Sequence, residues 1–186
     1  MLFITKTRTG LQRIARCAAL AGLYVLFVSA LLVSADVIVR KVFGIAFVGA
    51  DELGGYALAM ATSWALAYAF FEGSHIRVNV FHMTLAPRPK ALLDLLAVVV
   101  TAALVGMLGW QVWVVAFDSW VFDCVSNTPL RVPLWIPQSS FLGGILLFLV
   151  AAVVVALESI MLACKGNYAQ VIELVEENEK PGEYTL

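Results

Sequence analysis

The chain has 186 residues, of which 62% are hydrophobic and 13% are charged. A soluble domain is about half apolar and about a quarter charged, so this composition excludes an ordinary soluble globular protein and indicates a membrane protein. The formal net charge is -1 at pH 7, which gives no overall electrostatic attraction to nucleic acid or to an anionic substrate.

Four apolar segments are long enough to cross a bilayer, whose hydrocarbon core of about 30 Å needs about 20 helical residues. They cover residues 17–39, 53–71, 95–117 and 134–157, with boundaries that are approximate. The segments are too long and too evenly apolar for the alternating strands of a membrane barrel. The sequence therefore predicts an all-α membrane protein, a single four-helix membrane domain over residues 1–186.

The distribution of Lys and Arg predicts the orientation of these helices. Nine of these residues lie before the first segment, between the second and third, or after the fourth, whereas three lie in the two other connections. Basic residues favour the cytoplasmic side, so we expect both termini and the loop around residues 72–94 to be cytoplasmic. The acidic stretch 165–186 is then a cytoplasmic tail.

The N-terminus also has some features of a cleavable signal peptide. A basic start and an apolar run are followed by the small residues Val33-Ser34-Ala35 before Asp36. The apolar stretch 18–35 is longer than the 7 to 15 residues typical of a signal peptide. We therefore expect this segment to remain as the first transmembrane helix.

Charged residues gather on the expected outer side of the first two helices. Asp36 and Arg40 are four residues apart, the spacing at which helical side chains meet. Asp51 and Glu52 open the second helix, where the helix dipole favours negative charge. We hypothesise a polar clasp of Arg40 with Glu52, assisted by Asp36, that holds the first two helices as a hairpin. A structural role is favoured over substrate handling, because charges on a transport path are expected nearer mid-membrane.

A second polar cluster ends the second helix, in the stretch AFFEGSHIRVNVF. Gly73 permits a turn there, and Glu72, His75 and Arg77 are available to lipid headgroups or to a partner protein. The residues that follow mix apolar and polar side chains, which predicts an interfacial amphipathic segment between the second and third helices. The alternative is an ordinary polar helix end lying among headgroups.

The sequence contains no pattern typical of a catalytic, cofactor or metal site. Cys17, Cys124 and Cys164 match no metal-binding spacing. His75 and His82 lie in one short loop without a third ligand, whereas haem bound between helices needs histidines from facing helices. Phosphate-binding, nucleotide-binding and hydrolase motifs are also absent. We expect no catalytic residue, no metal and no cofactor in this chain.

Small residues in the second and third helices allow close helix packing. They are Gly54, Gly55, Ala59 and Ser63 in the second helix, and Gly106 and Gly109 in the third. Packing within the chain is the expected use of these residues.

Several stretches together resemble the small membrane subunit, of DctQ type, of the tripartite ATP-independent periplasmic (TRAP) transporters. In chain order they are ADVIVRKVFG, ADELGGYALA, EGSHIRVNVF, LAPRPKALLD and TPLRVPLWIPQSSFLGGILL. The resemblance covers roughly Asp36 to Leu149, and the exit EGSHIRVNVF is its most specific part. The first sixteen residues and the tail beyond Lys165 lie outside it.

The resemblance implies a small subunit of the bacterial inner membrane that assembles with a large membrane subunit and works with a periplasmic substrate-binding protein. It also implies sodium-coupled uptake of an organic acid, with the substrate and sodium sites in the large subunit. Membrane lipids are the other expected partners. Two alternatives remain: a membrane anchor of a redox complex, which needs paired histidines in separate helices, and a stand-alone four-helix carrier, which needs a buried acid at mid-membrane.

Overall fold

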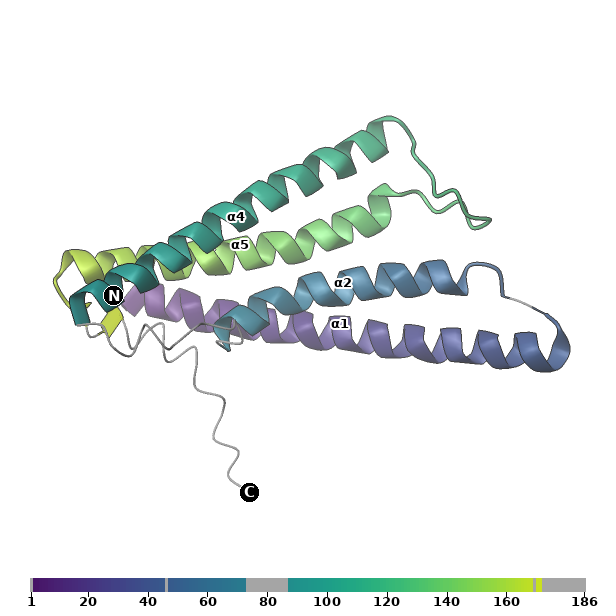
Figure 1. Ribbon diagram of the computed structural model, residues 1–186, viewed down its shortest axis with the longest axis horizontal. Helices are drawn as coiled ribbons and strands as arrows, with labels where there is room; N and C mark the ends of the chain where they lie inside the picture. Colours follow the sequence, from purple (N-terminus) through teal and green to yellow (C-terminus); the bar gives the residue numbers. More distant parts are fainter. Residues whose placement is uncertain (1, 46, 73–86, 169, 172–186) are drawn as a thin grey trace, which may run out of the picture.

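The computed structural model describes residues 2–45, 47–72, 87–168 and 170–171, and within them the protein is helical (Figure 1). The helices are α1 (Leu2–Phe43), α2 (Ala50–Phe71), α4 (Pro87–Val121) and α5 (Trp135–Cys164). Each predicted transmembrane segment falls within one of these helices, except that Leu134 precedes α5 as its cap. The predicted all-α fold with four helices is confirmed.

Three of the four helices are long and apolar enough to cross a membrane. The qualifying segments are Thr7–Phe43, Arg88–Val121 and Trp135–Cys164. Helix α2 has 22 residues and is richer in small and hydroxyl-bearing side chains. At about 1.5 Å per residue it is about 33 Å long, comparable with the hydrocarbon core of a bilayer.

The charges at the ends of the first two helices agree with the helix dipole. Arg40 and Lys41 occupy the last turn of α1, where the partial charge of the helix end is negative. Asp51 and Glu52 occupy the first turn of α2, where it is positive. Gly49 precedes α2 with a φ of 102°, a backbone conformation that favours glycine. The turn between the two helices is thus encoded locally.

The helices form two antiparallel hairpins, α1 with α2 and α4 with α5 (Figure 1). Helices α2 and α5 join the hairpins and run in the same direction, while α1 and α5 meet over a smaller area. We call the end with the α1–α2 and α4–α5 connections the hairpin end, and the opposite end the termini end. The two hairpins diverge toward the hairpin end, as Figure 1 shows.

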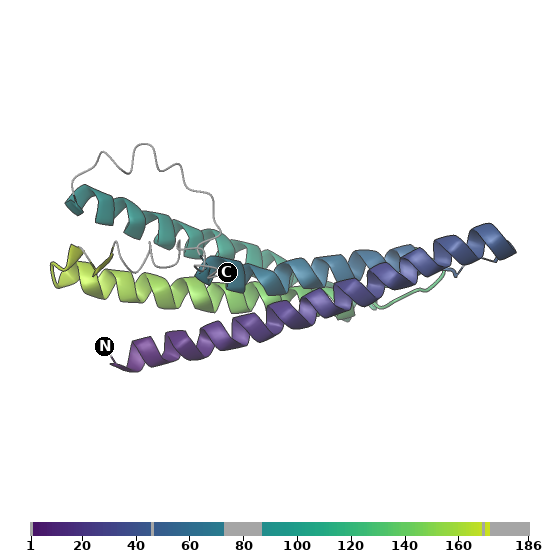
Figure 2. The same cartoon turned by 90° about the horizontal axis from the view of Figure 1, so that it is seen from below.

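The hydrophobic core lies where the hairpins converge toward the termini end. Phe70 of α2 and Phe148 of α5 pack with ring centroids 5.5 Å apart. Ala151, Ala152 and Val155 of α5 are fully buried in the same cluster. The second view shows α1 passing along the outside of α2 and α5 (Figure 2). This placement leaves most of α1 outside the core.

Small residues set the spacing between helices at two crossing points. A Cβ atom on Gly144 of α5 would lie 2.5 Å from the backbone carbon of Ser63 in α2, and one on Gly22 of α1 would lie 3.0 Å from Cα of Ala61. Ser63, predicted as a packing residue, therefore does contact another helix. Beside this crossing, Nε1 of Trp64 donates a 2.9 Å hydrogen bond to the backbone carbonyl of Ser140.

The other predicted packing glycines differ in their surroundings. Positions Gly54, Gly106 and Gly109 face Val33 of α1, Leu149 of α5 and Ile145 of α5 respectively. Gly55 has open space around its Cα, so it makes no close helix contact within the described chain. The sequence identified the small residues, but the partner of each depends on the tertiary arrangement.

Candidate assembly site at the hairpin end

Asp36 fixes the connection between α1 and α2. Its carboxylate is buried and accepts a hydrogen bond from the guanidinium of Arg40, one turn further along α1. Its other oxygen accepts a 2.6 Å hydrogen bond from the backbone N–H of Phe47, in the turn before α2. One side chain thus pairs with Arg40 in the last turn of α1 and holds the chain that leads into α2.

Glu52 makes a second anchor, which reaches the other hairpin. One carboxylate oxygen accepts a 2.5 Å hydrogen bond from the hydroxyl of Tyr56, and the other accepts a bond from the hydroxyl of Thr128. Thr128 lies in the α4–α5 connection and is 2.6 Å from the hydroxyl of Ser126. This network ties the start of α2 to a loop 76 residues further along the chain.

Hydroxyl groups around Glu52 stabilise its charged form. Glu52 immediately precedes the predicted transmembrane segment 53–71. Hydrogen bonds from Ser126, Thr128 and Tyr56 lower the pKa of the Glu52 carboxyl below its ordinary value, against an opposing contribution from burial. The carboxylate is therefore ionised at neutral pH, and the hydroxyl groups of Tyr56 and Thr128 donate to it directly.

The hypothesised Arg40–Glu52 clasp is not formed within the described residues. Arg40 pairs with Asp36, and Glu52 bonds to Tyr56 and Thr128. The Asp36–Arg40 contact follows the predicted spacing, and Asp51 is exposed at the start of α2. Two separate carboxylate anchors replace the single clasp, because the α4–α5 connection supplies hydroxyl donors to Glu52.

The α4–α5 connection, residues 122–134, has a defined backbone of its own. Val125 and Pro133 form an isolated antiparallel bridge, and Asp123 and Arg131 both have a φ of 48°. Its Leu130 side chain packs on Gly49, where a Cβ atom would lie 2.1 Å from Cδ1 of Leu130. The two connections therefore meet at the hairpin end, through Leu130 on Gly49 and Thr128 on Glu52.

Removing the Glu52–Thr128 bond is expected to reveal direct coupling between the hairpins. In a double-mutant cycle with Glu52→Gln and Thr128→Val, we expect a coupling free energy of about 1.5–3 kcal/mol, as for a hydrogen bond to a charged group. Thermal unfolding of the full-length wild type and the three variants in detergent measures this coupling. Additive effects of the two substitutions would contradict the bond.

The same cycle is expected to depend on pH. The folded-state pKa of Glu52 is lowered, so its stabilisation is present above the ordinary carboxyl pKa and is lost as the pH falls through the folded value. The stability difference between wild type and Glu52→Gln should therefore shrink on acidification. Thr128→Val, which removes one of the donors, should shift this loss to higher pH.

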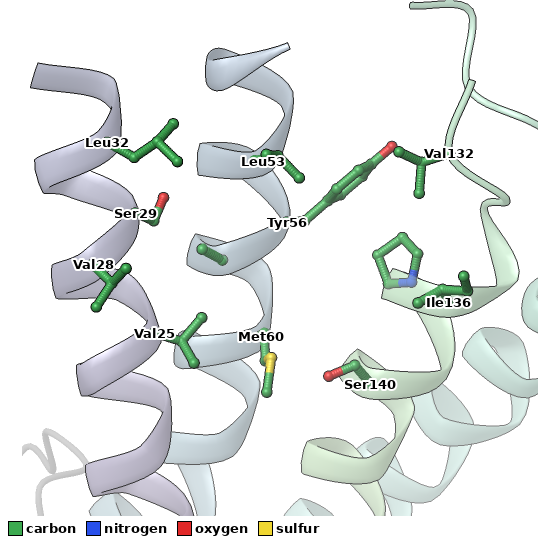
Figure 3. Close-up of a pocket in the computed structure, with 12 residues that line it drawn as sticks. Val25, Val28, Ser29, Leu32, Leu53, Tyr56, Met60, Val132, Ile136 and Ser140 are labelled. Carbon is green, nitrogen blue, oxygen red and sulfur yellow. The ribbon is translucent and has the colours of Figure 1, made fainter. Parts of the chain in front are cut away.

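An apolar cavity of about 470 Å³ lies between α1, α2 and the start of α5 (Figure 3). Its walls are mainly aliphatic, including Val28, Leu32 and Met60, and Ser29, Tyr56 and Ser140 are the polar side chains on its lining. This lining suits an apolar chain, and among the lining residues there is no carboxylate, imidazole, amine or thiol. Among the described residues, no three His, Cys, Asp or Glu side chains are grouped to hold a metal ion.

The second predicted cluster is described only at its first residue. Glu72 is exposed and follows the last residue of α2 as its cap, and its backbone N–H donates a 3.0 Å hydrogen bond to the carbonyl of Tyr68. Gly73, His75 and Arg77, together with the predicted interfacial segment, lie outside the described residues.

Sequence reasoning missed the partners of Glu52 and the links between α2 and α5. The Glu52–Tyr56 spacing of four residues was a usable signal. Thr128 and Ser140 gave none, because each lies 76 residues from the α2 residue that it contacts.

Comparison with known proteins identifies the family of the chain. The model of the family described as tripartite ATP-independent periplasmic transporters, DctQ component, matches residues 29–161. No curated protein and no solved structure gives a significant match. The matched region runs from within α1 to near the end of α5 and contains both carboxylate anchors. The chain therefore belongs to the DctQ family of TRAP transporter components, a non-enzymatic family of multi-pass membrane proteins.

Proposed function

We propose that this chain is the scaffold subunit of a TRAP transporter, which assembles with the large membrane subunit and works with a periplasmic substrate-binding protein. In this role it supports sodium-coupled uptake of an organic acid, while the large subunit carries the substrate and the sodium ions. Family membership is the observation that carries the proposal. The physical properties of the helices support it in three respects.

The first supporting property is the exposed surface of the chain. Helix α1 and the outer face of α4 expose many large apolar side chains, among them Leu23, Phe27, Leu104 and Met107. A chain with its apolar surface so widely exposed is suited to contact lipid and a larger membrane partner. A stationary, broadly anchored partner is what a moving carrier domain needs. Trp110, Trp113 and Trp120, in the last part of α4, suit the headgroup region.

The second supporting property is the location of the acidic residues. In α1, α4 and α5 they are Asp36, Asp94, Asp118 and Glu158, and all lie within about two turns of a helix end. Groups that carry ions or substrates are usually found near mid-membrane. This placement favours a bracing role over a carrier role for the chain.

The third supporting property is the packing of α2. Because α2 lies against both α1 and α5 and is antiparallel to α1, we infer that it is the fourth transmembrane helix. Four crossings place both termini on one side, and the excess of basic residues there assigns that side to the cytoplasm. The hairpin end, with both carboxylate anchors, then faces the periplasm.

Reconstitution tests the proposal. Proteoliposomes with all three components should show sodium-driven uptake, and omission of this chain should abolish it. The purified chain alone should move no solute and carry no coloured prosthetic group. Transport by the chain alone would favour a stand-alone carrier, and bound haem would favour a redox anchor.

The cluster at the end of α2 is expected to contribute to assembly. We predict that Arg77→Glu, or His75→Ala, reduces co-purification with the large subunit or lowers sodium-driven uptake, because the variant loses a group that can bind a partner or a headgroup. Lys180→Glu, a charge reversal in the tail outside the resemblance, is the control. Unchanged assembly and uptake in both variants would make the cluster an ordinary polar helix end.

A further inference from the structure

An aromatic cavity of about 340 Å³ opens between α4 and α5 at the hairpin end. Four aromatic side chains line it, three from the last part of α4 and one from the start of α5: Trp113, Phe117, Trp120 and Trp135. The other lining residues are small or aliphatic, apart from Ser139, whose hydroxyl donates to the backbone carbonyl of Ile136. The cavity thus presents aromatic rings and no ionisable group.

The local sequence places three of these rings on one face of α4. Trp113, Phe117 and Trp120 are separated by four and then three residues, the spacing at which helical side chains are neighbours. The rings of Trp113 and Phe117 stack, with centroids 6.3 Å apart and planes inclined by 16°. Ala116 lines the same cavity and is small, so it leaves space that a larger side chain would fill. Because the rings are carried by helices, they are positioned before any ligand binds.

These aromatic residues lie at the level of the membrane surface. Trp120 is the second-last residue of α4 and Trp135 is the first residue of α5, so the cavity lies at the ends of two candidate membrane spans. Tryptophan rings collect at this level because one edge is polar and the rest is apolar. Within the described chain, Trp64 donates its indole N–H to a carbonyl, whereas the indole N–H groups of Trp113, Trp120 and Trp135 have no protein acceptor. Three donors are therefore available to a ligand.

The charge around the cavity favours a cation. Asp118 and Asp123 are exposed on either side of Trp120 in the sequence, and the last turn of α4 contains no basic residue. The face of an aromatic ring attracts an ammonium group, and nearby carboxylates strengthen that attraction. The same groups repel an organic acid, so the cavity does not suit the substrate of the proposed transporter. The cavity in Figure 3, in contrast, has mainly aliphatic walls that suit an acyl chain.

We propose that the aromatic cavity binds the headgroup of a zwitterionic aminophospholipid such as phosphatidylethanolamine. The ammonium group of the lipid lies against the rings of Trp113, Trp120 and Trp135, and the free indole N–H groups donate to its phosphate or ester oxygens. A lipid is the occupant that this site meets directly, because headgroups surround the ends of membrane helices. The proposal requires that α4 and α5 cross the bilayer, and it is independent of assembly with the large subunit.

Native mass spectrometry of the delipidated full-length chain tests the headgroup. The chain is incubated with equal amounts of phosphatidylethanolamine and phosphatidylglycerol that carry identical acyl chains. We expect about fivefold more bound phosphatidylethanolamine, the size of one or two exposed cation–π contacts. Phosphatidic acid, which has the phosphate but no ammonium, should also bind more weakly.

Two results of this measurement would overturn the proposal. One is equal binding of the lipids, or a preference for either anionic lipid, because the ammonium group would then contribute nothing. The other is loss of the preference when the complex with the large subunit replaces the chain alone, because a group of the partner would then occupy the cavity.

Single replacements of tryptophan locate the site. Trp120→Leu, and Trp135→Leu on the opposite wall, should each lower the preference to about twofold, whereas Trp120→Phe, which keeps a ring but lacks the N–H, should retain more of it. Trp110→Leu is the matched control, because Trp110 lies on the same helix and is 66% exposed against 63% for Trp120, but does not line the cavity. Equal losses in Trp110→Leu and Trp120→Leu would show that the rings act only as a general interfacial belt.

Discussion

Replacing Gly144 with alanine is expected to destabilise the chain by about 3 kcal/mol, the upper end of the usual range for overpacking. The added Cβ would lie 2.5 Å from the backbone carbon and 2.7 Å from the backbone oxygen of Ser63. Backbone atoms cannot rotate away as a flexible side chain does, so α2 and α5 must separate. Separation would also strain the Trp64–Ser140 hydrogen bond beside the crossing.

Gly143 provides the matched control for this prediction. It precedes Gly144 in the same helix, and a Cβ atom there meets nothing within 4 Å. Gly143→Ala should therefore be neutral or stabilising by up to about 1 kcal/mol, since alanine favours helix more than glycine does. Thermal unfolding of both full-length variants in detergent gives the comparison. Equal stabilities would show that α2 and α5 do not approach so closely.

Replacing Asp36 with alanine is expected to destabilise the connection between α1 and α2 by about 2 kcal/mol, as for the loss of hydrogen bonds to a charged group. The side chain of Asp36 is 2% exposed, whereas that of Arg40 is 51% exposed. Water can therefore solvate Arg40 once its partner is removed. Most of the lost stability should come from the unpaired N–H of Phe47 and from the turn between α1 and α2, which is no longer held in place. Asp36→Asn, which keeps an acceptor for that N–H, should lose less.

Asp51→Ala is the control for the Asp36 variants. Asp51 is also an acid at the hairpin end, but it is exposed. Its replacement should remove only the favourable charge at the start of α2, about 0.3–1 kcal/mol. Unfolding temperature and protection of the α1–α2 turn from proteolysis are the measurements. If Asp36→Ala behaves like Asp51→Ala, the carboxylate does not hold the turn.

The class of the protein, its four apolar helical segments and its family could be predicted from the sequence, whereas the extension of α1 back to Leu2 and of α4 back to Pro87, within the predicted loop 72–94, could not. Long apolar runs bounded by charged residues specify membrane helices, because the length of each run reflects the thickness of the bilayer. The Asp36–Arg40 contact was also readable, because residues four apart on a helix are neighbours whatever the rest of the chain does.

Which side chains meet between helices depends on the tertiary arrangement and could not be predicted from the sequence. The partner of Glu52 is Thr128 rather than Arg40, and the close neighbour of Gly144 is Ser63. The free energy of such contacts depends on helix crossing points and on loop paths, which uniform apolar sequences do not encode locally. Lipid and helix surfaces are equally apolar, so small and polar residues fix the packing, and their partners are defined only when the helices are brought together.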